Sequence, residues 1–184
     1  KNNFPDPWVV IEKYGVDTLR FYLMNSVVMQ AENLNFSVKD LEIVHRKVVL
    51  ILWNCFQYLR TYGIQAGWKV GVRGEEASAS NALLDQWISI LTDELVREVT
   101  AGLDAYDTVR ATRAITDYSD NLSTWYVRRS RGRMDADFFT TLFFLTRSTL
   151  NYTFKSKKKC DRLFVKNGKS KYLKWSLFLR LFLN

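Results

Sequence analysis

The stretch LDQWISILTDELVREVTAGLDAYD, residues Leu84–Asp107, decides the fold class of this 184-residue chain. Its apolar residues recur at intervals of three and four, which is the spacing of one face of an α-helix. They are Leu84, Trp87, Ile88, Leu91, Leu95, Val99, Leu103 and Tyr106. Because acidic residues and Arg97 occupy the opposite face, the stretch predicts a long amphipathic helix that packs against other helices.

The same spacing occurs on both sides of this stretch. One stripe precedes it and consists of Leu41, Val44, Val48, Leu52, Cys55, Leu59 and Tyr62. Another follows Asp107, a predicted N-cap, and consists of Ala111, Ala114, Ile115, Tyr118, Leu122 and Trp125. Residues 137–150, DFFTTLFFLTRSTL, are apolar nearly all round and are a candidate fourth helix. Long amphipathic helices joined by short connections predict an all-α fold, an antiparallel helical bundle.

Cap and turn signals lie before and between these helices. Asp6 and Pro7 are typical of the start of a short helix, and Gly15 is typical of its end. Ser37 is a candidate start for the next long helix. The stretch Gly63–Ser80 contains four glycines and is predicted to be a loop.

Charge is distributed unevenly along the chain. The net charge is +8, but residues 1–137 carry 16 basic and 18 acidic residues, a net charge of −2. Residues 138–184 carry 11 basic residues and one acid, a net charge of +10. The basic excess therefore belongs to the C-terminal part, and total charge alone is no argument that the helical region binds nucleic acid.

The sequence contains no pattern that supports catalysis or metal binding. The single histidine, His45, has no second histidine, cysteine or carboxylate at ligand spacing. Cys55 and Cys160 fit no disulfide framework and favour a reducing compartment, so the cytoplasm is the expected location. There is no phosphate-binding glycine loop and no apolar run long enough to span a bilayer. We predict no catalytic residue, no metal ligand and no membrane partner.

Positive charge is concentrated locally in the stretch LSTWYVRRSRGRM, Leu122–Met134. It contains Trp125, Tyr126, Arg128, Arg129, Arg131 and Arg133. A helix C-terminus favours cations by about 0.3–1 kcal/mol each, but four arginines so close together repel one another. The residues alone leave three interpretations open: phosphate and base contacts with RNA, a structural helix end, or contact with an anionic membrane or protein.

Several motifs, taken in order, resemble the isoleucyl-tRNA synthetases, which are class I aminoacyl-tRNA synthetases. They are KNNFPDP, IEKYGVDTLRFYL, ENLNFS, VHRKVVLILWN, LDQWI, TAGLDAYD, RAI and LSTWYVRRSR. The resemblance covers Lys1 to about Arg133. It corresponds to the region from just after the KMSKS signature through the anticodon-binding helical bundle.

This resemblance implies a part of an isoleucine–tRNA ligase that docks tRNA. In the family the HIGH and KMSKS signatures, which serve ATP- and Mg-dependent activation, and the editing domain lie upstream. We therefore expect a fragment that holds no cofactor itself and is inactive alone. The implied partners are isoleucine-acceptor tRNA and the catalytic and editing domains of the same enzyme, which is expected to be a monomer.

The resemblance also implies roles for individual residues. Asp17 and Arg20 match the segment that joins the catalytic domain to the bundle. Trp53 and Asn54 match an LWN pattern, for which we expect core packing and a buried hydrogen bond. The WY-x-RR-x-R stretch lies on the tRNA-facing side in the family. The expected RNA contacts are Tyr126, Arg128, Arg129, Arg131 and Arg133.

The helical stripe predicts how the two rings of that stretch are oriented. Trp125 continues the apolar stripe that contains Leu122, so its indole is expected to point into the core. Tyr126 is then expected to point outward, toward RNA or the arginine row.

The expected division of the chain is a linker at 1–36 that contacts the tRNA stem, an anticodon-binding bundle at 37–145 and a basic tail at 146–184. Family members continue after the arginines into a LAPFTPF-like stretch followed by acids, and the likeness ends at about Thr146. We expect the tail to be disordered or non-native sequence, from a reading-frame change, an unspliced or misassembled gene, or an artefact. The alternative function is a stand-alone helical module whose tail, Lys155–Lys174, binds nucleic acid or anionic membrane nonspecifically.

Overall fold

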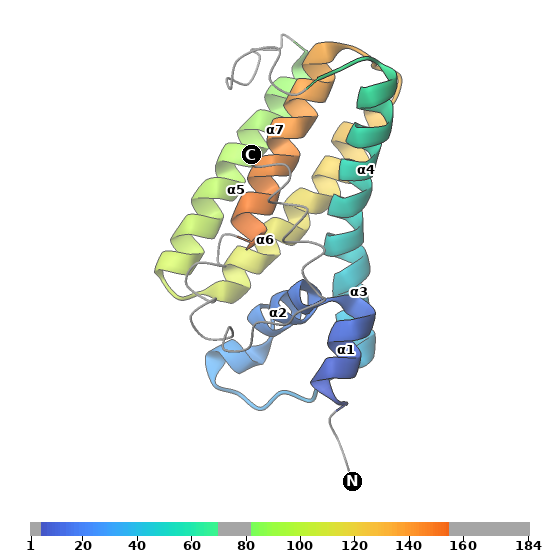
Figure 1. Cartoon of the computed structure of the whole chain (residues 1–184). Helices are drawn as coiled ribbons and strands as arrows, with labels where there is room; N and C mark the ends of the chain where they lie inside the picture. Colours follow the sequence, from blue (N-terminus) through green and yellow to red (C-terminus); the bar gives the residue numbers. More distant parts are fainter. Residues whose placement is uncertain (1–4, 70–81, 155–184) are drawn as a thin grey trace.

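The structure, a computed structural model, describes residues 5–69 and 82–154. Within these ranges every regular element is helical, which confirms the all-α class (Figure 1). The glycine-rich residues 70–81 and the tail 155–184, with its basic segment Lys155–Lys174, lie outside the described residues.

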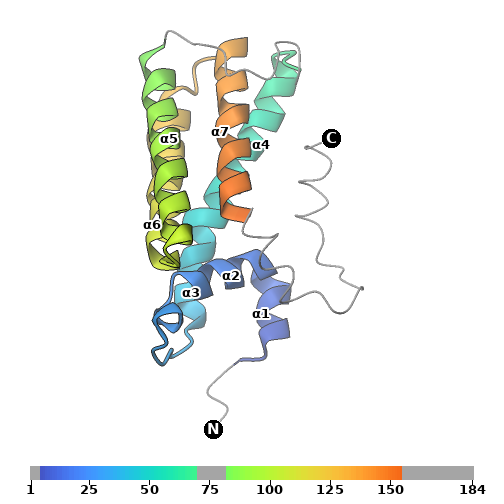
Figure 2. The same cartoon turned by 90° about the vertical axis from the view of Figure 1, so that its left-hand side faces the viewer.

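Four long helices form the antiparallel bundle that the apolar stripes predict. They are α4 (Leu50–Gln65), α5 (Leu83–Asp104), α6 (Thr108–Asp120) and α7 (Ala136–Phe154). Figures 1 and 2 show them side by side, with α4 and α6 running one way and α5 and α7 the other. The shared core includes Leu52, Cys55, Leu59, Ile88, Leu95, Val99, Ile115, Tyr118, Leu122, Phe138, Phe139 and Leu142. The candidate fourth helix therefore exists, and its phenylalanines fill the centre of the bundle.

The corner between α5 and α6 is closely packed. Asp107 caps α6 as predicted, because its carboxylate accepts a hydrogen bond of 2.9 Å from the N–H of Arg110. A Cβ added to Gly102 would lie 2.9 Å from the carbonyl oxygen of Asp107, so only glycine allows this approach. Tyr106 was expected on the apolar stripe, but the helix ends at Asp104 and Tyr106 has a φ of 59° and is exposed.

A smaller helical unit covers one end of the bundle. It consists of α1 (Pro7–Tyr14), α2 (Val16–Met24), the short 3-10 helix η1 (Val27–Gln30) and α3 (Val38–Val44). The predicted caps are confirmed: Asp6 accepts from the N–H of Trp8, and Ser37 accepts from the N–H of Asp40. Gly15 ends α1 with a φ of 85°, a conformation that favours glycine. Val10, Tyr22 and Leu41 form a second, separate core cluster.

Two π-helical turns interrupt the long helices and change the register of their side chains. They are η2 (His45–Val49), between α3 and α4, and η3 (Asn121–Val127), which continues α6. In η3 the N–H of Arg128 donates to the carbonyl of Ser123, five residues earlier. A π-helical turn contains more residues than an α-helical one, so each side chain is rotated by a smaller angle from the one before it. Tyr126, four residues after Leu122, is therefore turned toward the core.

The π-turn reverses the predicted orientation of the two rings. Tyr126 is fully buried, whereas the side chain of Trp125 is 47% exposed. The expectation that Trp125 points inward and Tyr126 outward is therefore wrong. Ideal α-helical spacing was the wrong assumption for this stretch.

Two element boundaries also differ from the expected ones. Gly63 was expected to begin a loop, but helix α4 includes it and ends only at Gln65. Gly63 is buried there and lies close to Trp68. Helix α7 continues to Phe154, past the expected end of the bundle at residue 145. The division of the chain into linker, bundle and tail stays a prediction.

Candidate nucleic-acid interface

The four arginines lie between η3 and α7, at the end of the bundle away from α1–α3 (Figure 1). One of them, Arg133, turns inward. Its Nη1 lies 2.7 Å from Oδ1 of Asp85 and its Nη2 lies 2.9 Å from Oδ2, so the guanidinium grips both carboxylate oxygens. Asp85 belongs to the first turn of α5 and is only 2% exposed. This ion pair ties the turn to the start of a different helix.

Tyr126 joins the same buried group. Its hydroxyl donates a hydrogen bond of 2.8 Å to Oδ1 of Asp85, and its ring packs against Phe138 with 5.7 Å between ring centroids. Burial, together with the adjacent Asp85 carboxylate, raises the pKa of Tyr126. Tyr126 therefore stays protonated and acts as a donor to Asp85.

Asp135 completes the group on the other side of Arg133. Its carboxylate accepts from Nε of Arg133 at 3.1 Å and from the N–H of Phe138 at 2.8 Å, and so caps α7. Burial would raise the pKa of Asp135, but the hydrogen bonds from Arg133 and the N–H of Phe138 outweigh it and lower the pKa. The hydrogen bond with Asp85 raises the pKa of Arg133. We call Asp85, Tyr126, Arg133 and Asp135 the anchor.

The other three arginines of the stretch face solvent. Arg128, Arg129 and Arg131 are exposed, and they make no ion pair with any residue in the two described ranges. The backbone that carries them is fixed, because the carbonyl of Arg131 accepts a hydrogen bond of 3.2 Å from the hydroxyl of Tyr58 on α4. We call these three residues the open arginines.

Trp125 lies directly beside the open arginines. The guanidinium carbon of Arg129 lies over the indole, 4.5 Å from the ring centroid. Such a cation–π contact at an exposed site is worth about 0.5–1 kcal/mol. The exposed indole and the guanidinium over it therefore present an aromatic and a cationic group together at the end of the bundle.

The structure separates the predicted RNA contacts into two groups. Arg128, Arg129 and Arg131 are accessible, Tyr126 is fully buried, and Arg133 is paired with two carboxylates while 26% of its side chain stays exposed. The outward orientation expected for Tyr126 is corrected, and RNA contact by Arg133 stays a prediction; the sequence reasoning missed their shared partner, Asp85. The signal that could have found this pairing is Asp85 itself, which follows Leu84 of the apolar stripe. A carboxylate that is buried at such a position requires a cation as its partner.

The remaining family-motif residues lie elsewhere. Asp17 and Arg20 form an ion pair of 3.0 Å within α2, and their role toward a catalytic domain stays a prediction. Trp53 is half-buried and packs near Phe56, with 5.8 Å between ring centroids. Asn54 is exposed, so the expected buried hydrogen bond is wrong for this residue.

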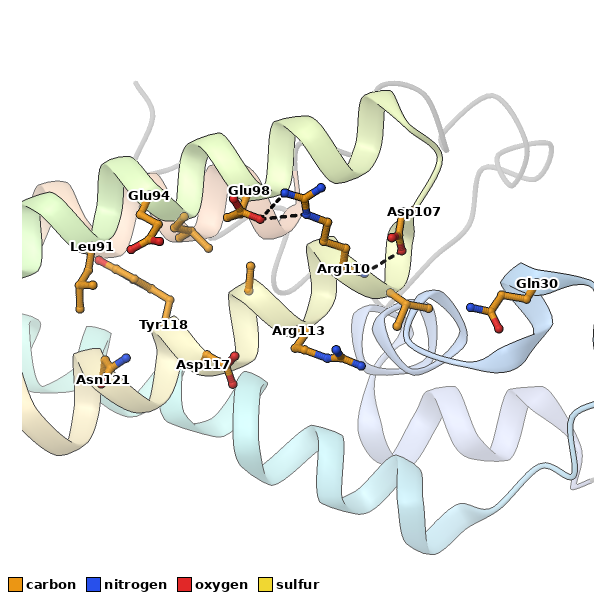
Figure 3. Close-up of a pocket in the computed structure, with 13 residues that line it drawn as sticks. Gln30, Leu91, Glu94, Glu98, Asp107, Arg110, Arg113, Asp117, Tyr118 and Asn121 are labelled. Atoms are coloured by element: carbon orange, nitrogen blue, oxygen red, sulfur yellow. Dashed lines mark hydrogen bonds and ion pairs between the residues drawn. The ribbon is translucent and has the colours of Figure 1, made fainter.

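A second surface feature is a groove between α5 and α6. Its charge is negative, whereas that of the open arginines is positive. Figure 3 shows it, with Arg110 reaching across to Glu98 at 2.7 Å. The groove has a volume of about 700 Å³, and its lining contains four acidic and two basic side chains. They are Glu94, Glu98, Asp107, Asp117, Arg110 and Arg113. An excess of carboxylates repels phosphate, so this groove is a poor RNA site compared with the open arginines.

In residues 5–69 and 82–154, no three His, Cys, Asp or Glu side chains are grouped so that they could hold a metal ion. None of the helices in these ranges has the length and apolar character needed to cross a bilayer.

Comparison with known proteins places this helical region in a family. Residues 85–156 match the family described as the anticodon-binding domain of tRNA ligase. The match starts at Asp85, contains the whole arginine stretch and extends beyond Thr146, where the likeness was expected to end.

Individual relatives carry the name isoleucine--tRNA ligase. The chain is 39% identical to the one from Protochlamydia amoebophila over 131 residues. These residues make up 71% of this chain and 12% of the relative. It is 36% identical over 141 residues to the one from Treponema pallidum, covering 71% of this chain and 13% of the relative. The ligase from Chlamydia trachomatis is 37% identical over 132 residues, which make up 72% of this chain and 12% of the relative. The chain thus spans about an eighth of the length of these relatives, and the resemblance seen in the sequence is confirmed.

Proposed function

Because this chain carries the anticodon-binding domain of tRNA ligases and is homologous to isoleucine--tRNA ligases, we propose that it docks isoleucine-acceptor tRNA. The contact is made by the open arginines at the end of the bundle. Each guanidinium offers a rigid fork of donors that fits a phosphate group. Phosphate contacts of this kind fix the position of a nucleic acid rather than read its sequence.

The observation that carries the proposal is the contrast in pairing among the four arginines. Arg133 meets two carboxylates, while Arg128, Arg129 and Arg131 meet none within the described ranges. Three unpaired cations within four residues of the chain repel each other, and a polyanion relieves that repulsion. The anchor supports the proposal because it holds the turn in place before RNA arrives, which lowers the entropy cost of binding.

The wider role is also proposed. The whole ligase attaches isoleucine to tRNA at the expense of ATP, with Mg²⁺, in catalytic and editing domains that are not among the described helices. We place no catalytic residue in this chain and expect it to bind tRNA without aminoacylating it, as a monomer in the cytoplasm.

The test is a comparison of two tRNAs on the complete chain. Wild type is titrated with isoleucine-acceptor tRNA and with an unrelated tRNA, and the double variant Arg128→Ala, Arg129→Ala is titrated in parallel. We expect wild type to prefer the isoleucine tRNA. The double variant should bind more weakly, and its plot of log affinity against log salt should be shallower by about 2, one for each phosphate contact.

Arg97→Ala is the matched control. Arg97 is the most exposed arginine among the ion pairs, at 71%, and lies on α5 next to Glu94 and Glu98. We expect this variant to retain both the affinity and the salt slope of wild type. Equal binding of the two tRNAs by wild type would contradict the docking of isoleucine tRNA, and would favour nonspecific binding through the basic tail instead.

A further inference from the structure

We propose that Trp125 and Arg129 form a stacking platform for an unpaired base of the docked tRNA. The inference rests on the proposed function and goes beyond it, because it assigns base contact to a residue pair rather than phosphate contact to charges. The platform consists of an exposed indole with a guanidinium lying over it, 4.5 Å from the ring centroid.

Trp125 is exposed although two apolar residues near it in the chain are buried. Leu122, three residues earlier, and Tyr126, the next residue, are fully buried, whereas 47% of Trp125 is exposed. The π-turn η3 produces this arrangement by rotating Trp125 out of the apolar stripe. Burial of the indole would stabilise the folded protein, because the indole has a large apolar area. Its exposure to water therefore costs free energy.

The chemistry of the surface points to a nucleobase. Every base has a flat π-face that stacks on an aromatic ring, and a guanidinium plane stacks on bases as well. Stacking needs a base that is not already paired and stacked in a duplex, which in RNA means a loop, bulge or single-stranded end.

The neighbouring charges place a phosphate backbone beside the platform. Arg128 adjoins Arg129 in the chain, and Arg131 lies in the turn that follows directly. Both are exposed and unpaired among the described residues. A strand whose phosphates contact Arg128 and Arg131 therefore brings its bases toward Trp125. An apolar protein partner would instead have to bury these unpaired cations, which is costly.

The test separates base contact from phosphate contact with two RNAs of equal charge. One is the anticodon stem-loop of isoleucine tRNA, and the other is the same stem-loop with its loop bases removed and its phosphates retained. The complete chain is titrated with both. Wild type should prefer the loop that carries bases by about 5- to 150-fold, the effect of one stacked base. Trp125→Ala should lose most of this preference without any change in salt slope.

Three further variants make the test specific. Arg129→Lys keeps the charge but loses the planar group, so it should keep the salt slope and lose part of the preference for bases. Trp125→Phe keeps an aromatic ring and should retain part of the preference. Trp8→Ala removes a 64% exposed indole on α1 and should change neither the preference for bases nor the salt slope.

The possible outcomes distinguish this inference from the proposed function. If wild type prefers isoleucine tRNA but Trp125→Ala still prefers the loop that carries bases as strongly as wild type does, stacking on Trp125 is overturned and docking stands. If wild type shows no preference for isoleucine tRNA but Trp125→Ala loses base preference, stacking stands and the choice of tRNA is overturned. If wild type binds neither stem-loop, both are overturned.

Discussion

Arg133 of the anchor and the open arginines lie within six residues of one another in the chain but have opposite surroundings. Arg133 grips a carboxylate that is 2% exposed, while Arg128, Arg129 and Arg131 project into solvent without an acidic partner in the described ranges. The difference teaches that the number of arginines does not indicate the number of RNA contacts. What separates the structural Arg133 from the arginines for which we propose RNA contact is the presence of a buried acid on another helix.

The largest expected effect comes from removing the cation of the anchor. Arg133→Ala leaves the buried carboxylate of Asp85 without its ion pair, which should lower the free energy of unfolding by about 3 kcal/mol. Chemical denaturation of the complete chain measures this change. Arg128→Ala is the control and should stay within about 0.5 kcal/mol of wild type. Similar losses for both variants would remove the distinction between the two groups.

Tyr126→Phe tests the second contact to Asp85 and should have a smaller effect. The substitution removes only the hydroxyl that donates to Oδ1 at 2.8 Å. Leaving a buried acceptor with one partner fewer should cost about 1–2 kcal/mol of unfolding free energy. Tyr106→Phe, at an 86% exposed position, should cost nothing measurable. If Tyr126→Phe is as harmless as Tyr106→Phe, Tyr126 is not part of the anchor.

The smallest expected effect concerns the pH dependence of Asp135. Its pKa is lowered in the folded state, so the stability that it contributes is present above its unfolded pKa, about 3.9, and is lost as the pH falls through the folded value. Asp135→Asn keeps a capping side chain but has no charge. Because Asp135 is 48% exposed, the difference from wild type at neutral pH should be below about 1 kcal/mol.

Denaturation curves at neutral pH and at about pH 2 measure this effect. Wild type and Asp135→Asn should differ at neutral pH, and the difference should be smaller at about pH 2, because the stability that the charge of Asp135 contributes is lost as the pH falls. A difference that is the same at both pH values would show that the charge of Asp135 does not stabilise the anchor.

Much of the fold follows from the sequence because helical spacing and capping are local properties. The stripe of Leu84–Tyr106, the cap at Asp107 and the short helix from Pro7 to Gly15 all needed only near neighbours in the chain. The ends were less predictable: Tyr106 leaves the stripe because α5 stops at Asp104.

The details of the site could not be predicted because they depend on two features that ideal helical spacing does not reveal. The π-turn at Asn121–Val127 shifts the register, so Trp125 and Tyr126 exchange the orientations that α-helical spacing predicts. The pairing of Arg133 with Asp85 joins residues far apart in the sequence. No spacing within the arginine stretch could show which of its members meets an acid.

The salt dependence of tRNA binding tests the central claim most directly. The triple variant Arg128→Ala, Arg129→Ala, Arg131→Ala is compared with wild type in the complete chain, with isoleucine-acceptor tRNA. We predict that the slope of log affinity against log salt decreases in magnitude by about 2–3, as expected for three lost phosphate contacts. The free energy of unfolding should stay within about 1 kcal/mol of wild type, including the lost contact between Arg129 and Trp125. An unchanged slope, or a loss of stability as large as that of Arg133→Ala, would contradict the division of this turn into an anchor and an RNA-binding surface.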